Sequence, residues 1–368
     1  RGLGDVYKRQ VLYKYSIGTL GTGTDAGEGC RVKLFVTGGA GFIGSVFTTM
    51  ALDGSLNLPG LEAVTVYDAL TYAGTLTNLT QCAKDPRFSF VRGDICDEET
   101  LHRAMSGHDA VIHFAAESHV DRSINGATTF AHTNVVGTAA VMQAAHDVGV
   151  ERGVHVSTDE VYGSIPSGSW PETDPLVPTS PYSASKAGSD LVAQSFFRSF
   201  NLPVVVTRCS NNYGPHQFPE KLIPLFVTNL MEGKKVPVYG DGSARRDWLH
   251  VTDHCRGLAL ALCKGRPGEV YNIGGGTELT ALEMTKRIVA EMGMGEDMIE
   301  FVADRPGHDM RYCVDYSKAR TELGYQPSVS FEDGIVSTIA WYRNNREWWE
   351  PLRAGAPRMD RLDTNSGK

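Results

Sequence analysis

Three consecutive polar residues, Thr158, Asp159 and Glu160, follow an apolar stretch that contains Val154 and Val156. A hydroxyl and two adjacent carboxyl groups at the end of a buried strand could perform acid–base chemistry. Neighbouring carboxyl groups can have their pKa values pushed apart, so that one stays protonated while the other is ionised. The alternative interpretation is structural, because Thr158 or Asp159 could cap a helix whose first turn favours acids. The rest of the chain has to decide between the two.

The pair Tyr182 and Lys186, in the stretch YSASK, is a second candidate for proton transfer. Four residues apart on a predicted helix, the two side chains share one face. A Lys ammonium about 4 Å from a phenol would bring the phenol pKa from about 10 to near 7, where a general base works best. Such pairs are also common on solvated helix surfaces, so this one gains weight from Thr158 upstream and from a glycine-rich loop.

That loop, TGGAGFIGS, places Gly38, Gly41 and Gly44 between a predicted strand at residues 32–36 and a helix. Glycines allow the tight turn and the close approach of a pyrophosphate to the helix N-terminus, although a glycine-rich loop without a ligand is the alternative. Asp68 ends the next strand, AVTVYD. Its carboxylate could accept hydrogen bonds from ribose hydroxyls and would repel a 2′-phosphate, which favours NAD over NADP.

An alternation of strands and helices must hold these residues in place. The apolar runs AVTVYD, FSFVRGD, DAVIHFAAES, RGVHVST and PVVVTRCS alternate with helical stretches such as EETLHRAMSG, TNVVGTAAVMQAAHDVG and SPYSASKAGSDLVAQSFFRSF. This alternation predicts an α/β fold, a Rossmann-type doubly wound parallel sheet covered by helices on both faces. The Pro- and Gly-rich texture that follows predicts a smaller, loop-rich C-terminal lobe.

These patterns give expected domain limits. We expect an NAD-binding domain at residues 31–210, a mainly substrate-binding lobe at 211–352 that is partly interleaved with it, and a tail at 353–368. Residues 1–30 begin with RGLGDVYKRQ and continue into a Gly- and Thr-rich stretch. We expect them to be a leader outside the domain, disordered or artefactual.

Composition limits the classes of partner. The chain has 368 residues and a formal net charge of -8, which argues against broad binding to nucleic acid or to anionic membrane. No apolar run approaches the roughly 18 residues of a membrane span. The seven cysteines are scattered without a C-x-x-C pair, so we expect no metal site, no disulfide framework and a reducing, cytoplasmic compartment.

In the order and spacing of its motifs, the chain resembles the extended short-chain dehydrogenase/reductase superfamily. Within it, the chain is similar to the nucleoside-diphosphate-glucose 4,6-dehydratases, and most of all to the dTDP-glucose 4,6-dehydratase family. The motifs are HFAAESHVDRSI, STDEVYGS, PYSASKAGSDLV, NNYGPHQFPEKLIP, RDWLHVTDHCRG, YNIGGG and DRPGHDMRY, and the likeness runs from about residue 32 to residue 349. It implies an NAD-dependent lyase that oxidises the sugar at C4, removes water across C5 and C6, and reduces C6.

The resemblance also implies the roles of single residues. It implies Asp159 as the acid and Glu160 as the base of the elimination, with Thr158 and Tyr182 at the sugar O4. The residues that it implies for NAD are Gly38, Gly41, Phe42, Ile43, Gly44, Asp68, Thr71, Asp94, Ile95, Ala115, Ala116, Thr133, Tyr182, Lys186 and Asn212. Those implied for the substrate are Ser118, Thr158, Asn211, Lys221, Leu222, Pro237, Tyr239, Arg246, Asn272, Asp304, Arg305 and His308.

Several alternatives stay open. A nucleotide-sugar 4-epimerase or decarboxylase on the same scaffold is opposed by the adjacent Asp159 and Glu160, and a non-catalytic NAD-binding regulator is opposed by the intact Tyr182 and Lys186. The nucleotide base could be dTDP, UDP, CDP or GDP, and either Arg246 or its neighbour Arg245 could face the diphosphate. Apolar helices around residues 138–148 and 182–200 fit the homodimer typical of the superfamily, or packing within the chain.

Overall fold

A computed structural model of the chain describes residues 31–304 and 309–355. The expected leader, Arg305, His308 and most of the expected tail lie outside the described residues. The centre is a seven-stranded sheet in the order β10-β6-β5-β4-β1-β2-β3, with every neighbouring pair parallel. Without β10 this is the 3-2-1-4-5-6 order of dinucleotide-binding sheets, so the predicted Rossmann-type fold is confirmed. Its strands are β1 (Val32–Thr37), β2 (Leu61–Asp68), β3 (Phe88–Arg92), β4 (Ala110–His113), β5 (Arg152–Thr158), β6 (Val204–Cys209) and β10 (Val270–Ile273).

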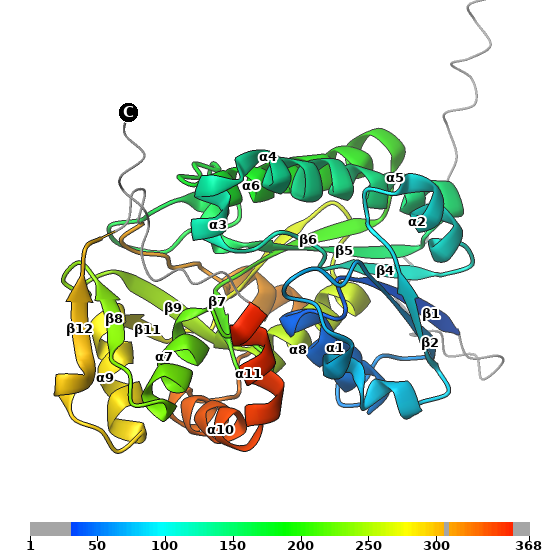
Figure 1. Ribbon diagram of the computed structural model, residues 1–368. Coiled ribbons are helices and arrows are strands. Elements are labelled where there is room, and N and C mark those ends of the chain that lie inside the picture. The colour runs from blue at the N-terminus through cyan, green and yellow to red at the C-terminus, as the bar shows by residue number, and fades with distance from the viewer. Residues whose placement is uncertain (1–30, 305–308, 356–368) are drawn as a thin grey trace, which may run out of the picture.

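Helices cover both faces of this sheet (Figure 1). Leu34 and Val36 of β1 pack with Phe47 of the first helix in one core, whereas Phe35 packs in a second core on the opposite face. This follows from the alternation of side chains along a strand. On one face lie α1 (Phe42–Leu52) and α8 (Val251–Lys264), and on the other α2 (Glu98–Met105), α3 (Val120–Asn125), α4 (Ala127–Ala131), α5 (Gly137–Val148) and α6 (Pro181–Phe200).

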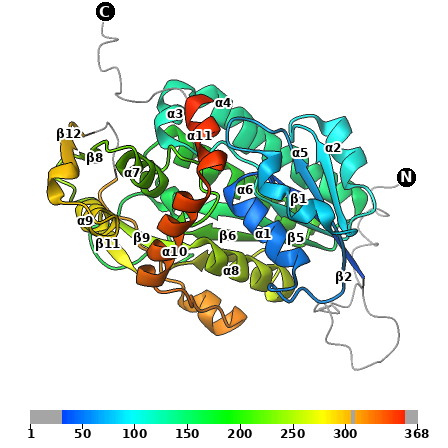
Figure 2. The same cartoon turned by 60° about the horizontal axis from the view of Figure 1, so that its bottom comes forward.

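A second lobe lies beside the sheet (Figure 1, Figure 2). Its strands β11, β9 and β7 form one small sheet, and β12 pairs with β8. A third apolar core, in which Trp349 is fully buried, holds its helices together. The elements are β7 (Asn211–Tyr213), α7 (Leu222–Met231), β8 (Val236–Tyr239), β9 (Arg245–His250), β11 (Glu278–Thr280), α9 (Ala281–Glu291), β12 (Ile299–Val302), α10 (Phe331–Asn344) and α11 (Arg346–Gly355).

The two lobes are not separated at a single point in the sequence. Helix α8 and strand β10 come from the C-terminal half of the sequence but pack on and in the central sheet. The expected tail also begins too early, because α11 continues to Gly355. Arg353 on that helix donates a hydrogen bond to Asn229 Oδ1 at 2.9 Å and lies 3.3 Å from Glu232. A bilayer-spanning helix is not found in the ranges that the structure describes.

Candidate active site

A cavity of about 330 Å³ opens at the carboxyl ends of the central strands. Residues that directly follow or end β1, β2, β4, β5 and β6 line it, among them Gly38, Asp68, Phe114, Thr158 and Cys209. Doubly wound sheets bind their ligands in this crevice, because the strand order reverses there and the helices on either side leave room. The site therefore has the location that the fold predicts.

The glycine-rich loop forms the first wall of the cavity. Gly38 has a φ of +69°, and a Cβ there would lie 2.5 Å from the backbone nitrogen of Ala115. A Cβ on Gly44 would lie 2.4 Å from the carbonyl oxygen of Gly38. Gly41 is the N-cap of α1 and offers no side chain to the first backbone N–H groups of that helix. The loop thus fits the pyrophosphate of a dinucleotide, which binds to such N–H groups.

Asp68 is fixed beside this loop by backbone donors. Its Oδ2 accepts a hydrogen bond from Ala40 N at 2.9 Å, and its Oδ1 accepts one from Leu70 N at 2.8 Å. Burial raises the pKa of Asp68, and the two backbone hydrogen bonds oppose that rise. Each carboxylate oxygen can accept a further hydrogen bond. The side chain therefore suits the paired hydroxyls of a ribose.

Thr133 enters the cavity from an unusual helical segment. It lies in a π-helical turn, His132–Val136, between α4 and α5, and such turns occur frequently at functional sites. In the same turn Asn134 accepts a hydrogen bond from the backbone N–H of Glu117 at 2.8 Å and donates one to Ser185 Oγ at 2.8 Å. The turn thereby ties the loop after β4 to helix α6.

The structure brings the residues expected to contact NAD to this one cavity. Their contact with the cofactor stays a prediction, but their location is compatible with it. The lining includes Gly38, Gly41, Phe42, Ile43, Gly44, Asp68, Thr71, Asp94, Ile95, Ala115, Ala116, Thr133, Tyr182, Lys186 and Asn212.

Thr158 and the two acids after it lie at the far end of the same cavity. Thr158 ends β5, and Asp159–Tyr162 form a single 3₁₀ turn that Thr158 caps by accepting a hydrogen bond from Glu160 N at 3.3 Å. Thr158 Oγ1 also donates to Asp159 Oδ1 at 3.3 Å. The capping interpretation is therefore confirmed for Thr158, and the same turn presents the two acids to the cavity. Their acid–base role stays a prediction.

The environment of Asp159 favours its protonated form. The residue is 2% exposed. Burial, and then the neighbouring carboxylates of Glu160 and Asp247, raise the pKa of Asp159 well above its ordinary value, although Arg246 and Thr158 oppose them. Its Oδ2 is buried and has no hydrogen-bond partner among the described residues. A neutral carboxyl with one free oxygen at a cavity wall can act as a proton donor.

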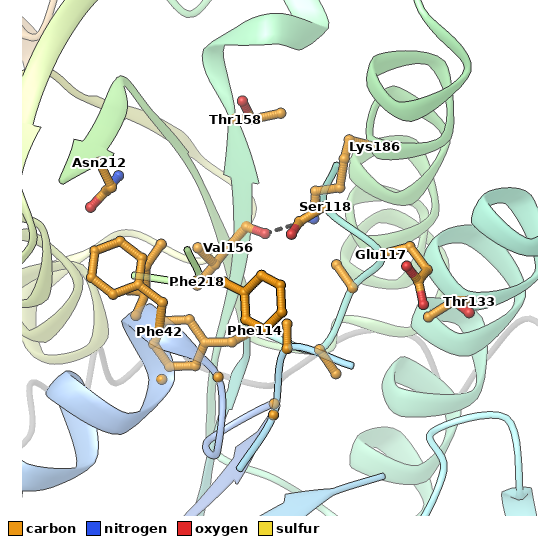
Figure 3. A pocket seen from close by; sticks show the side chains of 18 of the residues that line it. Phe42, Phe114, Glu117, Ser118, Thr133, Val156, Thr158, Lys186, Asn212 and Phe218 are labelled. Atoms are coloured by element: carbon orange, nitrogen blue, oxygen red, sulfur yellow. Dashed lines mark hydrogen bonds between the residues drawn. The ribbon is translucent and has the colours of Figure 1, made fainter. Parts of the chain in front are cut away.

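Tyr182 and Lys186 share one face of α6, but the expected effect of the lysine on the phenol is wrong. Burial, and then Glu160, raise the pKa of Tyr182 well above 10, with a hydrogen bond to Thr158 opposing them. Lys186 Nζ instead donates to the backbone oxygen of Val156 at 2.8 Å (Figure 3). Burial lowers the pKa of Lys186 to about 8. The lysine binds a strand carbonyl, so desolvation and nearby carboxylates dominate the titration of the phenol.

The residues expected to bind substrate divide into two groups. Ser118, Thr158, Asn211 and Lys221 line the cavity, and Asn211 Oδ1 is buried there without a partner in the described part of the chain. Lys221 Nζ donates to the backbone oxygen of Ser118 at 2.6 Å, which links the second lobe to the loop after β4. The lining does not include the other described ones: Leu222, Pro237, Tyr239, Arg246, Asn272 and Asp304.

The two adjacent arginines face different ways. Arg245 is exposed and lies 3.6 Å from Glu278. Arg246 is partly buried, donates hydrogen bonds to the backbone oxygens of Arg245 and Asp309 at 2.7 Å and 2.8 Å, and lowers the pKa of Asp159. Of the two, Arg246 is therefore the one whose charge acts on Asp159. Which of them faces the diphosphate stays a prediction.

Asn272 is not available to a substrate, contrary to the expectation. Its side chain is fully buried, and its Oδ1 accepts a hydrogen bond from the Tyr162 hydroxyl at 2.9 Å. Its Nδ2 donates to the backbone oxygens of Trp170 and Asp315 at 2.9 Å and 3.1 Å. Strand β10 is the edge strand of the central sheet, next to β6, and the asparagine ties the segments that lie beside this edge together.

Sequence reasoning named Phe42 but missed the rest of the apolar wall of the cavity. Figure 3 shows Phe42, Phe114, Val156 and Phe218 on one side of the pocket, with Glu117, Thr133 and Lys186 on the other. Phe114 and Val156 could have been found, because they lie at or next to strand ends. Phe218 belongs to a loop, and only the tertiary structure brings it there. No group of three or more His, Cys, Asp or Glu in the described ranges is placed to hold a metal ion.

Comparison with known proteins agrees with this geometry. The model of the GDP-mannose 4,6 dehydratase family matches residues 35–338. The chain belongs to this family. Among family relatives, the dTDP-glucose 4,6-dehydratase of an Actinoplanes strain is 59% identical over 319 residues, which cover 86% of this chain and 100% of the relative. The dTDP-glucose 4,6-dehydratase of Streptomyces niveus is 56% identical over 323 residues, 88% of this chain and 96% of the relative.

The family fold is also found among solved structures. The crystal structure of DesIV, a dTDP-glucose 4,6-dehydratase from Streptomyces venezuelae solved with NAD and a second ligand bound, has a TM-score of 0.86 and 58% identity. The match covers 87% of this chain and 99% of DesIV. The resemblance stated from the motifs is thereby confirmed, as is the fold.

Proposed function

We propose that this member of the family catalyses the NAD-dependent dehydration of dTDP-glucose to the 4-keto-6-deoxy sugar. One observation carries the proposal. Thr158, Asp159, Glu160 and Tyr182 line the same cavity as the glycine-rich loop. Redox residues and an adjacent acid pair therefore face one space beside a dinucleotide cradle. The names of the closely similar relatives support the same activity.

The first wall of the cavity would hold NAD. The loop at Gly38 and the N-terminus of α1 would bind its pyrophosphate, and Asp68 its ribose hydroxyls. NAD⁺, when bound, takes a hydride from C4 of the sugar and later returns it to C6. The chain itself has to move protons and exclude water around that exchange.

Thr158 and Tyr182 would act on the sugar O4. Tyr182 must be ionised to accept the O4 proton, and the hydrogen bond with Thr158 favours the ionised form whereas burial and Glu160 oppose it. We therefore expect oxidation at C4 to become faster as the pH rises above neutral.

Asp159 and Glu160 would carry out the elimination. A ketone at C4 makes the C5 hydrogen acidic, so Glu160 can remove it as base. Asp159, whose raised pKa keeps it protonated, would donate its proton to the departing C6 hydroxyl, which leaves as water. Once hydride has returned to C6, a proton must be returned to C5 to give the 4-keto-6-deoxy sugar. An epimerase that only inverts C4 has no use for this pair, so the acids favour dehydration.

The test is direct. The purified chain is incubated with dTDP-, UDP-, CDP- and GDP-glucose, and the products are weighed. We expect dTDP-glucose to lose one water. An isomer of unchanged mass would indicate an epimerase and contradict the proposal. Glu160→Gln should still form NADH transiently but should stop exchange of the C5 hydrogen with solvent. If NADH never appears in that variant, the role given to Glu160 is wrong.

We also infer a homodimer that forms through the helices on the outer side of the sheet. Leu191 and Phe200 of α6 are 57% and 49% exposed, and Val136, just before α5, is 49% exposed. Exposed apolar side chains on neighbouring helices are typical of an interface. Leu191→Glu should therefore shift the species seen by sedimentation velocity from dimer to monomer. A monomer before the substitution would contradict the inference.

A reducing, cytoplasmic location is the remaining part of the proposal. The described cysteines, Cys82, Cys96, Cys209, Cys255, Cys263 and Cys313, are all free thiols. Free, partly buried thiols suit a compartment that keeps cysteines reduced. Fractionation of producing cells should recover the enzyme in the cytoplasm, and recovery from an extracellular fraction would contradict this.

A further inference from the structure

Three buried side chains, Asp190, Arg208 and Tyr162, connect helix α6 with the turn that follows β5. Their exposures are 0%, 2% and 1%. Arg208 Nε donates a hydrogen bond to Asp190 Oδ2 at 2.9 Å, and another guanidinium nitrogen of Arg208 donates to the Tyr162 hydroxyl at 2.7 Å. The guanidinium carbon also lies 4.7 Å from the centre of the Tyr162 ring. We refer to these residues as the Asp190–Arg208–Tyr162 bridge.

Each end of the bridge belongs to an element that carries chemistry. Asp190 follows Tyr182 and Lys186 at a spacing of four residues along α6, so the three lie on one face of the helix. Tyr162 is the last residue of the turn Asp159–Tyr162, which begins with the two acids. The bridge thus joins the element with the redox residues to the element with the elimination residues.

The bridge is charged although it is buried. Burial alone would raise the pKa of Asp190, but His155 and Arg208 outweigh it and leave that pKa below its ordinary value. A buried ion pair adds little net stability compared with an apolar pair, because both ions must be desolvated. What it offers here is fixed geometry, since the planar guanidinium binds two partners in set directions.

Tyr162 is held from a second side as well. Its hydroxyl donates to Asn272 Oδ1 at 2.9 Å while it accepts from Arg208. Its ring stacks on Trp170, with centroids 6.0 Å apart and an angle of 15° between the planes. The turn that carries Asp159 and Glu160 cannot shift without breaking these contacts.

We propose that the Asp190–Arg208–Tyr162 bridge is a positioning device that keeps the elimination acids in register with the redox residues, so that both steps act on one bound sugar. The inference rests on the proposed function. None of the three residues lines the cavity, so they act through Lys186, Tyr182 and the acid turn and do not touch the substrate.

The test compares the two half-reactions in single turnovers of Tyr162→Phe. NADH formation reports oxidation at C4, and loss of NADH together with loss of water reports elimination and reduction. A small misplacement of a reacting group can cost about a hundredfold in rate. We expect elimination to slow by about ten- to a hundredfold while oxidation changes less than about twofold. NADH should therefore accumulate in the variant.

Tyr325→Phe is the matched control. Tyr325 is also 1% exposed, and its hydroxyl donates one hydrogen bond, to the backbone oxygen of Gly274 at 2.9 Å. It should lose similar stability without changing the ratio of the two rates. If Tyr162→Phe slows both steps equally, or no more than Tyr325→Phe does, the bridge has no positioning role. If the unchanged enzyme neither forms NADH nor removes water, the proposed function itself fails, which is a different result.

A second variant tests the same bridge from its centre. Arg208→Lys keeps the charge but loses the planar guanidinium, whose nitrogens bind Asp190 and Tyr162 at the same time. Combined with Tyr162→Phe, it should lower the elimination rate no further than the more severe single variant, because both break the same link. Effects that multiply would show two independent defects and would overturn the inference.

Discussion

The glycine-rich loop and the polar residues of the C-terminal half of the chain are held in place by different means. In the loop, backbone meets backbone: a Cβ on Gly38 would lie 2.5 Å from Ala115 N, and the Asp68 carboxylate accepts hydrogen bonds from two backbone N–H groups. In the C-terminal half of the chain, polar side chains make the contacts between segments. The Asn272 side chain has three hydrogen bonds to other segments, and the Arg246 guanidinium donates to two backbone oxygens.

This difference predicts how each region responds to change. A site built from backbone contacts has no side chain that can move aside, so one added methyl group disrupts it. A site built from side-chain networks shares its contacts among several groups. Two residues of the same type can therefore differ in role, one holding the structure and the other binding a ligand. The variants below compare pairs of similar residues, from the largest expected effect to the smallest.

Gly38→Ala should disrupt the part of the site that binds the cofactor. A left-handed backbone costs an alanine about 1–2 kcal/mol, and the overlap with the Ala115 backbone adds to that. We expect about 3 kcal/mol of lost unfolding free energy and NAD affinity lowered at least about a hundredfold, measured by urea unfolding and titration calorimetry. Gly107→Ala is the control, because its φ is +78° but no described atom lies within 4 Å of a Cβ. Equal NAD affinity in both variants would contradict the backbone argument.

Asn272→Ala and Asn211→Ala should separate structure from binding in the second half of the site. Asn272→Ala leaves buried partners without hydrogen bonds and should cost about 2–3 kcal/mol of unfolding free energy, with the KM for substrate little changed. Asn211→Ala should raise the KM several-fold and leave stability within about 0.5 kcal/mol. A large KM effect of Asn272→Ala in folded enzyme would restore the role that the sequence assigned to it.

Arg246→Ala and Arg245→Ala test which guanidinium serves the site. The charge of Arg246 acts on Asp159, so the loss of Arg246 should raise the KM about tenfold or more, the size of one charge-assisted hydrogen bond. Arg245 is exposed and paired with Glu278, and its loss should change the KM less than about twofold. The opposite order of effects in steady-state kinetics would exchange the two assignments.

Asp159→Asn should change stability modestly, with a sign that depends on pH. The folded-state pKa of Asp159 is raised, so its contribution to stability is present below the ordinary Asp value of 3.8 and is lost as the pH rises through the folded value. Compared with the unchanged enzyme, the variant should be about 1 kcal/mol more stable at neutral pH and equally stable near pH 4. It should also lose elimination. Lower stability at neutral pH would indicate an ionised Asp159.

Much of the fold and of the cofactor half could be predicted because the signals are local. Gly38, Asp68 and Thr158 each stand at or just after the end of an apolar run, and parallel strands bring such ends to one edge. The acid pair follows the same rule, whereas Tyr182 reaches the same cavity from the start of helix α6. The electrostatics were predicted less well. The spacing of Tyr182 and Lys186 correctly placed both side chains on one face of α6, but the pKa of Tyr182 is raised and not lowered.

The sequence by itself determined the order of strands and helices, the glycine cradle and the acids at a strand end, because each depends on side-chain type and short spacing. Only the tertiary structure decided that the charge of Arg246 acts on Asp159 and that the Asn272 side chain is hydrogen-bonded to Tyr162. It also decided that Asp190 and Arg208 form an ion pair. Each of these facts depends on how deeply the group is buried, on which segments the fold brings beside it, and on which hydrogen-bond partners those segments offer. Such partners come from distant parts of the chain, and no local pattern records them.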